Sequence, residues 1–401
     1  MSDVDASSPR RFRRLRTVLR WVGRAVLVLV LGIVGVLVTY RDAFGASAEG
    51  ARLAEMQASP QWDGDGFENP EPLWNGFSFG WFIEKSFAEG PPQAPEDALP
   101  VRDPRPALAA PRGLQITWLG HSTSVVQIEG ATFLLDPVWG PAASPVPWLG
   151  PARWSEPVIP LDELPELDAV IISHDHYDHL DMPTVKALDT RDVPFYAPLG
   201  VGAHLARWGV PESRIVELDW WDRREVAGIE LVCTPSRHAS GRELLDQNAT
   251  LWAGWAFLGD AKRLFFSGDT GLFDGMKRIG EELGPFDVTM VEVGAYDAAW
   301  PDWHLGPEQA VQAHGWLRGD VMLPVHWGLF DLAFHGWTEP MERVLAAAEA
   351  TGTRVVTPRI GETVDADAPR PPERWWPENA WQTAEEAPVI ATAVDGRPAR
   401  E

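Results

Sequence analysis

The stretch SHDHYDH, residues 173–179, limits the possible folds of this chain more than any other segment. It follows the apolar run Ala169–Ile172 directly, and that run has the length and composition of a buried strand. Imidazole nitrogens and carboxylate oxygens suit Zn²⁺, and they converge on one ion only where the backbone turns tightly, as on leaving a strand. The stretch therefore predicts a metal site at a strand end. The alternative is a solvated polar loop.

Other apolar runs are also followed by potential metal ligands. The seven candidates at strand ends are His174, His176, Asp178, His179, His238, Asp269 and His326. Side chains at strand ends gather at one edge of a sheet, where ligand sites of layered α/β folds usually lie. Seven ligands exceed what one tetrahedral zinc uses. We therefore expect two metal ions that share a bridging ligand.

The pattern His174-x-His176-x-Asp178-His179, with the later His238, Asp269 and His326, resembles the ligand set of the metallo-β-lactamase superfamily. The resemblance implies an α/β fold, the metallo-β-lactamase-type αββα four-layer sandwich. It implies that one zinc is bound by His174, His176 and His238. The second would be bound by Asp178, His179 and His326, with Asp269 as the bridge. Iron and manganese are alternative metals.

Further motifs resemble the branch of this superfamily that contains the N-acylphosphatidylethanolamine-hydrolysing phospholipase D. They are WLGHST (118–123), DPVWG (136–140), ASPVPWLGPARW (143–154), GDTG (268–271) and HWGLF (326–330). The similarity begins near residues 44–45 and continues to about residue 376. The superfamily motif is specific for fold and metal, whereas the branch motifs indicate the chemistry more than the exact substrate.

Short apolar runs and helical stretches are interspersed from Gly113 onward. The runs are too short for helices and lack the alternation of half-exposed strands, so we expect strands buried on both faces. Asp181 predicts the start of a helix, with Pro183 in its first turn, and Gly306-Pro307-Glu308 opens another that runs to about Leu317. This pattern favours a layered α/β domain.

Composition divides the chain into five regions. Residues 41–112 are rich in proline, glycine and aromatic residues, which is typical of an irregular segment that packs onto a larger body. The expected regions are a basic cytoplasmic tail (1–20), a transmembrane anchor (21–40), this irregular segment (41–112), the hydrolase domain (113–365) and a Pro- and Trp-rich tail (366–401).

The anchor is predicted from an apolar run over residues 25–40, which with extension back to Trp21 approaches the roughly 20 residues that a membrane span needs. Seven arginines precede the run and only Arg41 follows it closely, which predicts a cytoplasmic N-terminus and a body across the membrane. Thirty arginines against four lysines are typical of a high-G+C bacterial genome. We therefore expect a single-pass protein of the bacterial inner membrane, with its catalytic domain on the periplasmic or outer side.

A cleaved signal peptide is the alternative to an anchor, because Ala46-Ser47-Ala48 matches the small-residue cleavage pattern. A cut there would remove residues that belong to the family resemblance, so we favour the anchor.

The charge of the chain argues against a nucleic-acid partner. There are 58 acidic and 34 basic residues, a net charge of −24, and such a surface repels a phosphate backbone. The single cysteine, Cys233, excludes a disulfide framework and a thiolate-clustered zinc finger.

Several residues outside the ligand set are candidates for supporting roles. His304 matches a family histidine near the substrate phosphate and precedes a helix N-terminus, so we expect it to contact phosphate or to protonate the leaving alkoxide. The alternative for His304 is a loop cap. Asp136 and His121 are expected to orient metal ligands or loop backbone. The alternative for both is a purely structural hydrogen bond. His204 and His314 are expected to be surface or core residues.

The loop 139–154 is the candidate for lipid contact, because it has little charge and three tryptophans. These are Trp139, Trp148 and Trp154. The alternative is that the rings are ordinary core.

These features together predict a membrane-anchored di-zinc phosphodiesterase that acts on a glycerophospholipid. The family resemblance implies that it converts N-acylphosphatidylethanolamine to phosphatidic acid and N-acylethanolamine. A metal-bridging hydroxide would attack phosphorus. Asp178, Asp269 and His304 are the expected catalytic residues, and the expected partners are a phospholipid substrate and the membrane. The alternatives are a lactone- or lactam-hydrolysing enzyme of the same fold and a non-catalytic envelope protein. The last is disfavoured, because such a protein would be expected to have lost ligands.

Overall fold

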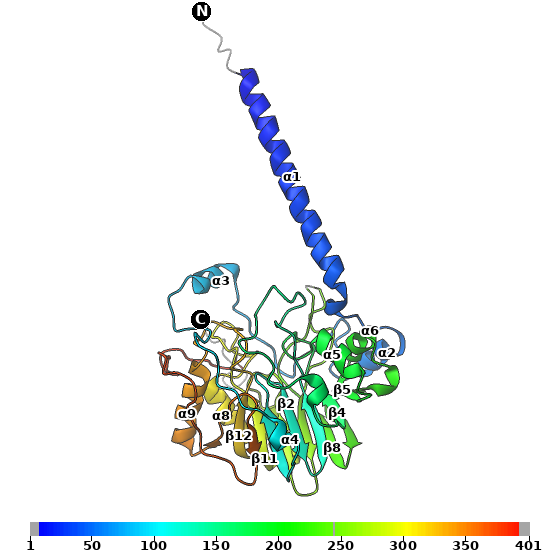
Figure 1. Ribbon diagram of the computed structural model, residues 1–401, viewed down its shortest axis with the longest axis vertical. Helices are drawn as coiled ribbons and strands as arrows, with labels where there is room; N and C mark the ends of the chain where they lie inside the picture. The colour runs from blue at the N-terminus through cyan, green and yellow to red at the C-terminus, as the bar shows by residue number, and fades with distance from the viewer. Residues whose placement is uncertain (1–7, 244, 393–401) are drawn as a thin grey trace, which may run out of the picture. The chain divides into compact units, whose positions relative to one another are not determined.

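The computed structural model describes residues 8–243 and 245–392, and the chain divides into two compact units between Phe44 and Gly45. The first unit consists of helix α1 (Ser8–Tyr40) and the 3₁₀ turn η1 (Arg41–Phe44) (Figure 1). Leu19–Phe44 is the one stretch of the described residues that is long and apolar enough to cross a membrane. A signal sequence has the same properties, so the helix alone leaves both predictions open. Residues 1–7 of the predicted basic tail lie outside the described residues.

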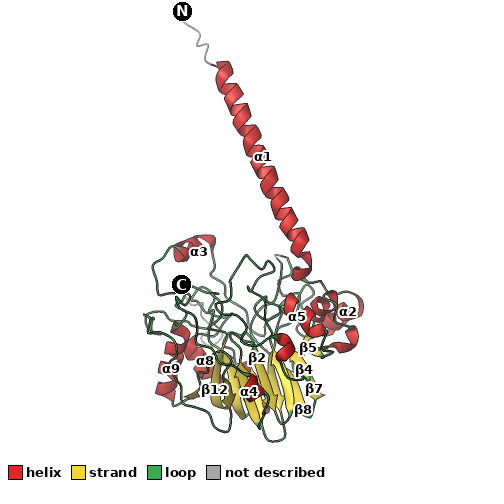
Figure 2. Cartoon of the chain, in the orientation of Figure 1, coloured by secondary structure: helices red, strands yellow, loops and turns green. Residues whose placement is uncertain are grey.

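The second unit is built on two seven-stranded mixed sheets (Figure 2). The first sheet has the order β14-β1-β2-β3-β4-β5-β6 and the second the order β13-β12-β11-β10-β9-β8-β7. The strands of the first sheet are β1 (Leu114–Trp118), β2 (Ser124–Ile128), β3 (Ala131–Leu135), β4 (Ala169–Ile171), β5 (Phe195–Pro198), β6 (Ile215–Leu218) and β14 (Thr363–Asp365). Those of the second are β7 (Arg223–Val226), β8 (Ile229–Thr234), β9 (Gly254–Leu258), β10 (Arg263–Phe266), β11 (Phe286–Glu292), β12 (Gly319–Val325) and β13 (Arg354–Val355).

Strand β3 shows why the apolar runs lack alternation. Phe133 and Leu135 point into the large central core, whereas Leu134 belongs to a separate core formed with the helices of the first sheet. Side chains of a strand alternate between its two faces, so a strand covered on both faces is apolar throughout. The prediction of strands buried on both sides is confirmed.

Helices cover the outer faces of both sheets. Helices α5 (Met182–Asp189) and α6 (Gly202–Arg207) contribute to the core of the first sheet, and α7 (Gly275–Glu282), α8 (Pro307–Trp316) and α9 (Glu339–Thr351) belong with the second (Figure 1). The side chain of Asp181 caps α5 by accepting a hydrogen bond from Thr184 N, and Pro307 opens α8. Both helix starts are as predicted, and the four-layer metallo-β-lactamase fold is confirmed.

The strand directions bring the ends of four strands of the second sheet to one edge. Strands β10, β11 and β12 are parallel neighbours, and β8 runs in the same direction because two antiparallel pairings, through β9, separate it from β10. The chain leaves these strands toward His238, Asp269 and His326, and Glu292 is the last residue of β11. One edge therefore collects polar side chains from distant parts of the sequence.

Short helices interrupt the segments that flank the sheets. Helices α2 (Gly50–Ala58), α3 (Phe79–Ser86) and α4 (Arg105–Leu108) lie within the segment that the sequence predicts to be irregular, and short 3₁₀ turns occur at Leu161–Glu163 and Glu212–Arg214. From this segment Met56 and Phe67 join the central core, and in the C-terminal tail Trp376 and Ala391 are buried. Residues 393–401 of that tail lie outside the described residues.

Candidate metal centre

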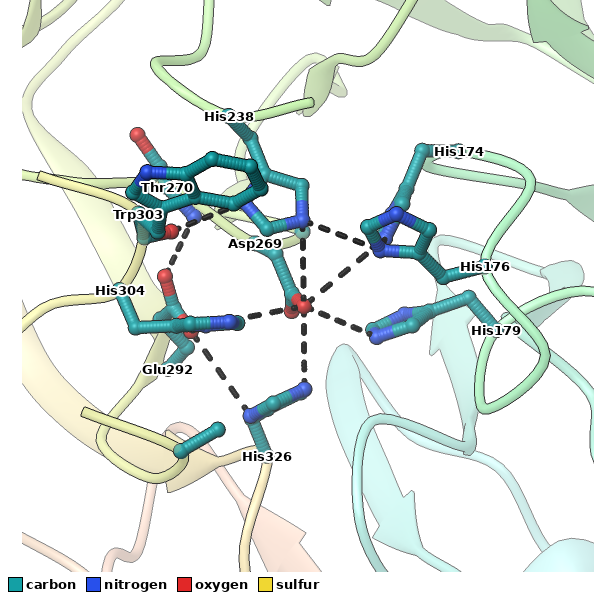
Figure 3. Close-up of polar contacts among 12 residues, drawn as sticks. His174, His176, His179, His238, Asp269, Thr270, Glu292, Trp303, His304 and His326 are labelled. Atoms are coloured by element: carbon teal, nitrogen blue, oxygen red, sulfur yellow. Dashed lines mark hydrogen bonds and ion pairs between the residues drawn. The ribbon is translucent and has the colours of Figure 1, made fainter. Parts of the chain in front are cut away.

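The carboxylate of Asp269 lies at the centre of the histidine cluster (Figure 3). Its Oδ2 atom is 3.0 Å from His326 Nε2 and 3.2 Å from His179 Nε2. The same atom is 3.8 Å from the Nε2 atoms of both His174 and His238. Asp269 is thus in a position to serve two groups of ligands at once.

The first group consists of His174, His176, His238 and Asp269. Nδ1 of His176 lies 2.9 Å from His174 Nε2 and 3.2 Å from His238 Nε2. One ligand atom from each of the four residues can be chosen so that all lie within 4.8 Å of one another. These are the residues that the family resemblance assigns to one metal together with its bridge.

The second group is formed around Asp178. Its Oδ2 lies 3.3 Å from His326 Nε2, 3.4 Å from His179 Nε2 and 2.9 Å from His121 Nε2. The structure therefore places His121 within this group, although the sequence suggests only a supporting role for it. A hydrogen bond from His121 to Asp178 and direct metal binding by His121 are both compatible with this position.

The composition of the cluster fits two divalent metal ions. It consists of imidazole nitrogens and carboxylate oxygens, which are the ligands of zinc and of other divalent transition metals. Oδ1 of Asp269 is buried and has no hydrogen-bond partner among the described residues. Buried polar atoms in proteins are normally paired, so this oxygen is suited to a cation.

Hydrogen bonds at Nδ1 orient two of the histidines. His179 Nδ1 donates to Asp136 at 2.8 Å. Ser173 Oγ donates to the same carboxylate at 2.6 Å and therefore accepts from His174 Nδ1 at 2.9 Å. Each ring then directs Nε2 at the cluster, and Asp136 occupies the orienting position suggested by the sequence. Asp136 also accepts from Ser173 N, so it holds the loop backbone as well.

His238 is held in the same way by a backbone carbonyl, since its Nδ1 donates to Trp303 O at 2.8 Å. Burial lowers the pKa of His238 and of His174 well below the usual range. Both rings are therefore neutral near pH 7, which leaves a lone pair on Nε2 for a metal.

The half of the site around Asp178 has an excess of negative charge. Burial alone would lower the pKa of His326, but the carboxylates of Asp269 and Asp178 outweigh it and raise the pKa to about 10. At His179, too, the carboxylates of Asp269 and Asp178 outweigh burial and raise the pKa well above its usual value. A divalent cation would satisfy these carboxylates in place of the protons.

His304 lies beside the cluster, on the loop between β11 and α8. Its ring centroid is 5.0 Å from that of His238 and 5.2 Å from that of His326. Its Nδ1 lies 3.8 Å from Asp269 Oδ2 and 2.8 Å from Glu292 Oε2. The family resemblance placed His304 near the substrate, and the structure places it next to the predicted ligands.

Glu292 is a site residue that the sequence analysis missed. Its buried carboxylate accepts hydrogen bonds from Thr270 N and from His304 Nδ1, and burial raises its pKa. With Asp269, His304 and His326 it forms a third group able to hold a metal. A signal was available, because Glu292 is the one charged residue in the apolar run 288–293.

Asp175 was also missed. It lies within the histidine-rich stretch and accepts hydrogen bonds from Gly241 N and Thr250 Oγ1, and His204 Nε2 lies 3.3 Å from its carboxylate. Asp175 therefore holds the loop that carries His174 and His176. His204 is a buried residue, and so is His314 beside Thr289, in agreement with the expectation of surface or core positions.

The three tryptophans proposed for lipid contact have different surroundings. Trp139 donates from Nε1 to Ile159 O, and Trp154 packs edge-on against Trp337. Trp148 is 66% exposed, and its neighbour Leu149 is 58% exposed. Of the three rings, Trp148 is the most exposed, whereas Trp139 and Trp154 are half-buried.

Comparison with known proteins shows which proteins this chain resembles. Residues 131–327 match the model of the beta-lactamase superfamily domain. An uncharacterized protein of Mycobacterium tuberculosis is 44% identical over 346 residues, which cover 83% of this chain and 91% of that protein. The N-acyl-phosphatidylethanolamine-hydrolyzing phospholipase D 1 of Caenorhabditis elegans is 36% identical over 271 residues, or 63% of this chain and 76% of that enzyme.

A solved structure supports the same fold. The isothiocyanate hydrolase from Delia radicum gut bacteria superposes with a TM-score of 0.50 at 20% identity, covering 63% of this chain and 98% of that one. At this identity the likeness concerns the fold alone.

Proposed function

This chain belongs to the metallo-β-lactamase superfamily of metal-dependent hydrolases, and we propose that it is a phosphodiesterase that cleaves a glycerophospholipid in the manner of a phospholipase D. The proposed substrate is N-acylphosphatidylethanolamine, and the products are phosphatidic acid and an N-acylethanolamine. The similarity to the Caenorhabditis elegans phospholipase extends over three quarters of that enzyme, which supports this choice within the superfamily.

The observation that carries the proposal is the complete ligand set with His304 beside it. The other six predicted ligands lie around Asp269, and the ring of His304 packs against two of them. A phospholipase D needs both a centre that binds the phosphodiester and a proton donor for the departing headgroup. The cluster and His304 provide these two parts.

The chain's own residues would hold two metal ions. His174, His176 and His238 would bind one ion, Asp178, His179 and His326 would bind the other, and Asp269 would be shared. When bound, such ions supply a nucleophilic water of lowered pKa and neutralise charge on the phosphoryl oxygens. Asp136, Ser173 and Trp303 keep three of the imidazoles in the required tautomer.

Glu292 and His304 act together in the proposed reaction. The carboxylate of Glu292 accepts from His304 Nδ1, which leaves Nε2 as the atom that exchanges a proton with substrate. Cleavage breaks the bond between phosphorus and the headgroup oxygen, and a water oxygen takes its place on phosphorus. His304, protonated at Nε2, delivers the proton that the leaving oxygen requires, and the proton that the water loses returns to His304 Nε2.

The N-terminal helix bears on the location of the enzyme in the cell. We propose that Leu19–Phe44 is an uncleaved anchor in a bacterial inner membrane and that the body, from the irregular segment through the 113–365 hydrolase domain, faces the periplasm. The seven arginines before the apolar run support this orientation. An anchored enzyme meets its lipid substrate by diffusion within the membrane.

The test is product analysis with purified, full-length protein of measured metal content. A panel of phospholipids that includes N-acylphosphatidylethanolamine is incubated with the enzyme, and the products are identified by mass spectrometry. We expect phosphatidic acid and N-acylethanolamine from the wild type and neither from His176→Ala. Fully metallated protein that leaves every phospholipid intact would contradict the proposal, and lactones and lactams would then be the substrates to assay.

A further inference from the structure

Helix α3 and the residues that flank it expose several large apolar side chains. Phe79 is 74% exposed and Phe87 is 83% exposed, and Phe77, Phe82 and Ile83 are each at least 40% exposed. No residue of α3 is buried. Isolated exposed apolar residues are common on soluble proteins, but five within eleven consecutive residues form a patch that marks an interaction surface.

The helix is held to the body by its opposite side. The ring of Trp81 packs edge-on against Trp300 and Phe334, with centroid distances of 5.2 Å in both cases. The side chain of Ser78 caps the helix by accepting from Trp81 N. Phe79 and Ile83, one turn apart, therefore face outward from a defined helix, which stands apart from the sheets in Figure 1.

The segment that carries this patch is packed on the loop of His304. Trp300, on which α3 packs, is four residues before His304 in the same loop. The chain entering α3 is tied to this loop as well, since Trp74 N donates to Asp302 at 2.8 Å and Gly76 N donates to Ala299 O at 2.7 Å. A partner that covers α3 is therefore attached, through these contacts, to the loop that carries His304.

Charge and chain connectivity indicate that the partner of this patch is a lipid bilayer. Residues 77–87 contain one acidic and one basic residue, whereas the chain as a whole carries a net charge of −24. A neutral segment rich in phenylalanine and tryptophan suits the membrane interface better than the acidic surface does. The body begins at Gly45, directly after the apolar stretch Leu19–Phe44, so an anchored body remains close to the bilayer.

We propose that α3, with the flanking Phe77 and Phe87, is an interfacial helix that inserts its outward face into the bilayer and so positions the loop of His304 at the lipid surface. This inference rests on the proposed function and on its anchor. It shifts the main lipid contact from the loop 139–154 to α3. An amphipathic segment of this kind lies in the plane of the interface and does not span the membrane.

The test uses full-length protein reconstituted into phosphatidylcholine and phosphatidylglycerol vesicles. The chain's single cysteine, Cys233, is buried, so a polar, thiol-reactive dye labels a cysteine introduced at the surface. The variants Phe79→Cys and Phe87→Cys carry an environment-sensitive dye, and lipids with doxyl-labelled acyl chains act as the quencher. Asp260→Cys is the matched control, because it is exposed in the β9–β10 turn, at the end of β10 opposite Asp269.

We expect the dye at positions 79 and 87 to shift to shorter wavelength and to lose fluorescence with doxyl lipids, and the dye at position 260 to do neither. Equal quenching at all three positions, or none at 79 and 87, would overturn the proposal. A blue shift that grows with protein concentration, without quenching by doxyl lipid, would also overturn the proposal. That result would show that a second copy of the chain covers α3. Catalysis is not involved, so failure of the proposed phospholipase activity would be seen separately.

Discussion

Removal of the Asp302 carboxylate is expected to destabilise the body of this protein strongly. Asp302 has no exposed side-chain area, and its ion-pair partner Arg237 is 1% exposed, with 2.7 Å between Nη1 and Oδ1. The same carboxylate accepts hydrogen bonds from Trp74 N and from the backbone and side chain of Thr392. One side chain therefore joins the N-terminal segment, the β8 loop and the C-terminal tail.

The magnitude follows from burial. Loss of one member of a buried ion pair costs about 3–5 kcal/mol, because the remaining charge stays buried without a partner. Asp302→Ala also leaves three further donors without their acceptor. We therefore expect a loss of about 4 kcal/mol in the free energy of unfolding, a large part of the 5–15 kcal/mol typical of proteins.

The assay is urea denaturation of the full-length protein in detergent, followed by tryptophan fluorescence. Glu282→Ala is the matched control, since Glu282 pairs with Arg278 on the surface of α7, where the two side chains are 42% and 60% exposed. We expect the control to lose less than about 0.5 kcal/mol, as is usual for exposed pairs. A double variant, Asp302→Ala with Arg237→Met, should recover part of the loss because no buried charge then remains.

Two results would refute this reasoning. A loss below about 1 kcal/mol in Asp302→Ala would show that the buried pair contributes no more than an exposed one. A double variant that is no more stable than Asp302→Ala would show that an unpaired Arg237 is not the source of the cost.

Three other changes test the site. His304→Ala should lower phospholipid turnover by about 10²–10⁴ and leave the metal content at the wild-type value, since the ring lies beside the ligands and is proposed to act on the leaving group; loss of metal in this variant would contradict a role toward substrate. Glu292→Gln should lower turnover, but by less than His304→Ala does. The amide oxygen can still accept from His304 Nδ1, but it carries no charge. Turnover equal to that of wild type would show that the carboxylate is not needed. Asp269→Ala should reduce the bound metal, measured by plasma mass spectrometry, by more than His176→Ala does, because Asp269 contacts both ligand groups; equal metal content in the two variants would argue against a shared ligand.

The fold class and a set of candidate metal ligands could be predicted from the sequence because both depend on local patterns. An apolar run followed by a histidine or aspartate identifies a buried strand and the polar group at its end. The spacing of His174, His176, Asp178 and His179 leaves few alternatives to a metal site. The helix starts at Asp181 and Pro307 were predictable for the same reason, since a cap acts within one turn of the chain.

Asp136 was found among the supporting residues in this way, but others were not. Glu292 is marked in the sequence only as a charged residue in an apolar run, and its contact with His304 is visible only when β11 places the two side by side. Asp302 lies two residues before His304, and its partners Arg237 and Thr392 lie 65 and 90 residues away. Such contacts depend on which strands and loops are neighbours, and the order of strands in a sheet is not a local property.

Exposure of the aromatic residues was likewise decided by the tertiary structure. The sequence presents Trp139, Trp148, Trp154 and the rings of residues 77–87 as similar apolar groups in loop-like segments. Packing places Trp139 and Trp154 against the body, and it leaves Phe79 and Phe87 open to solvent. The sequence by itself determined the fold family and the candidate ligands, because residue type at the end of each apolar run is a local property. The tertiary structure decided which groups hold the candidate ligands in place and which aromatic side chains are exposed, because both depend on contacts between distant segments.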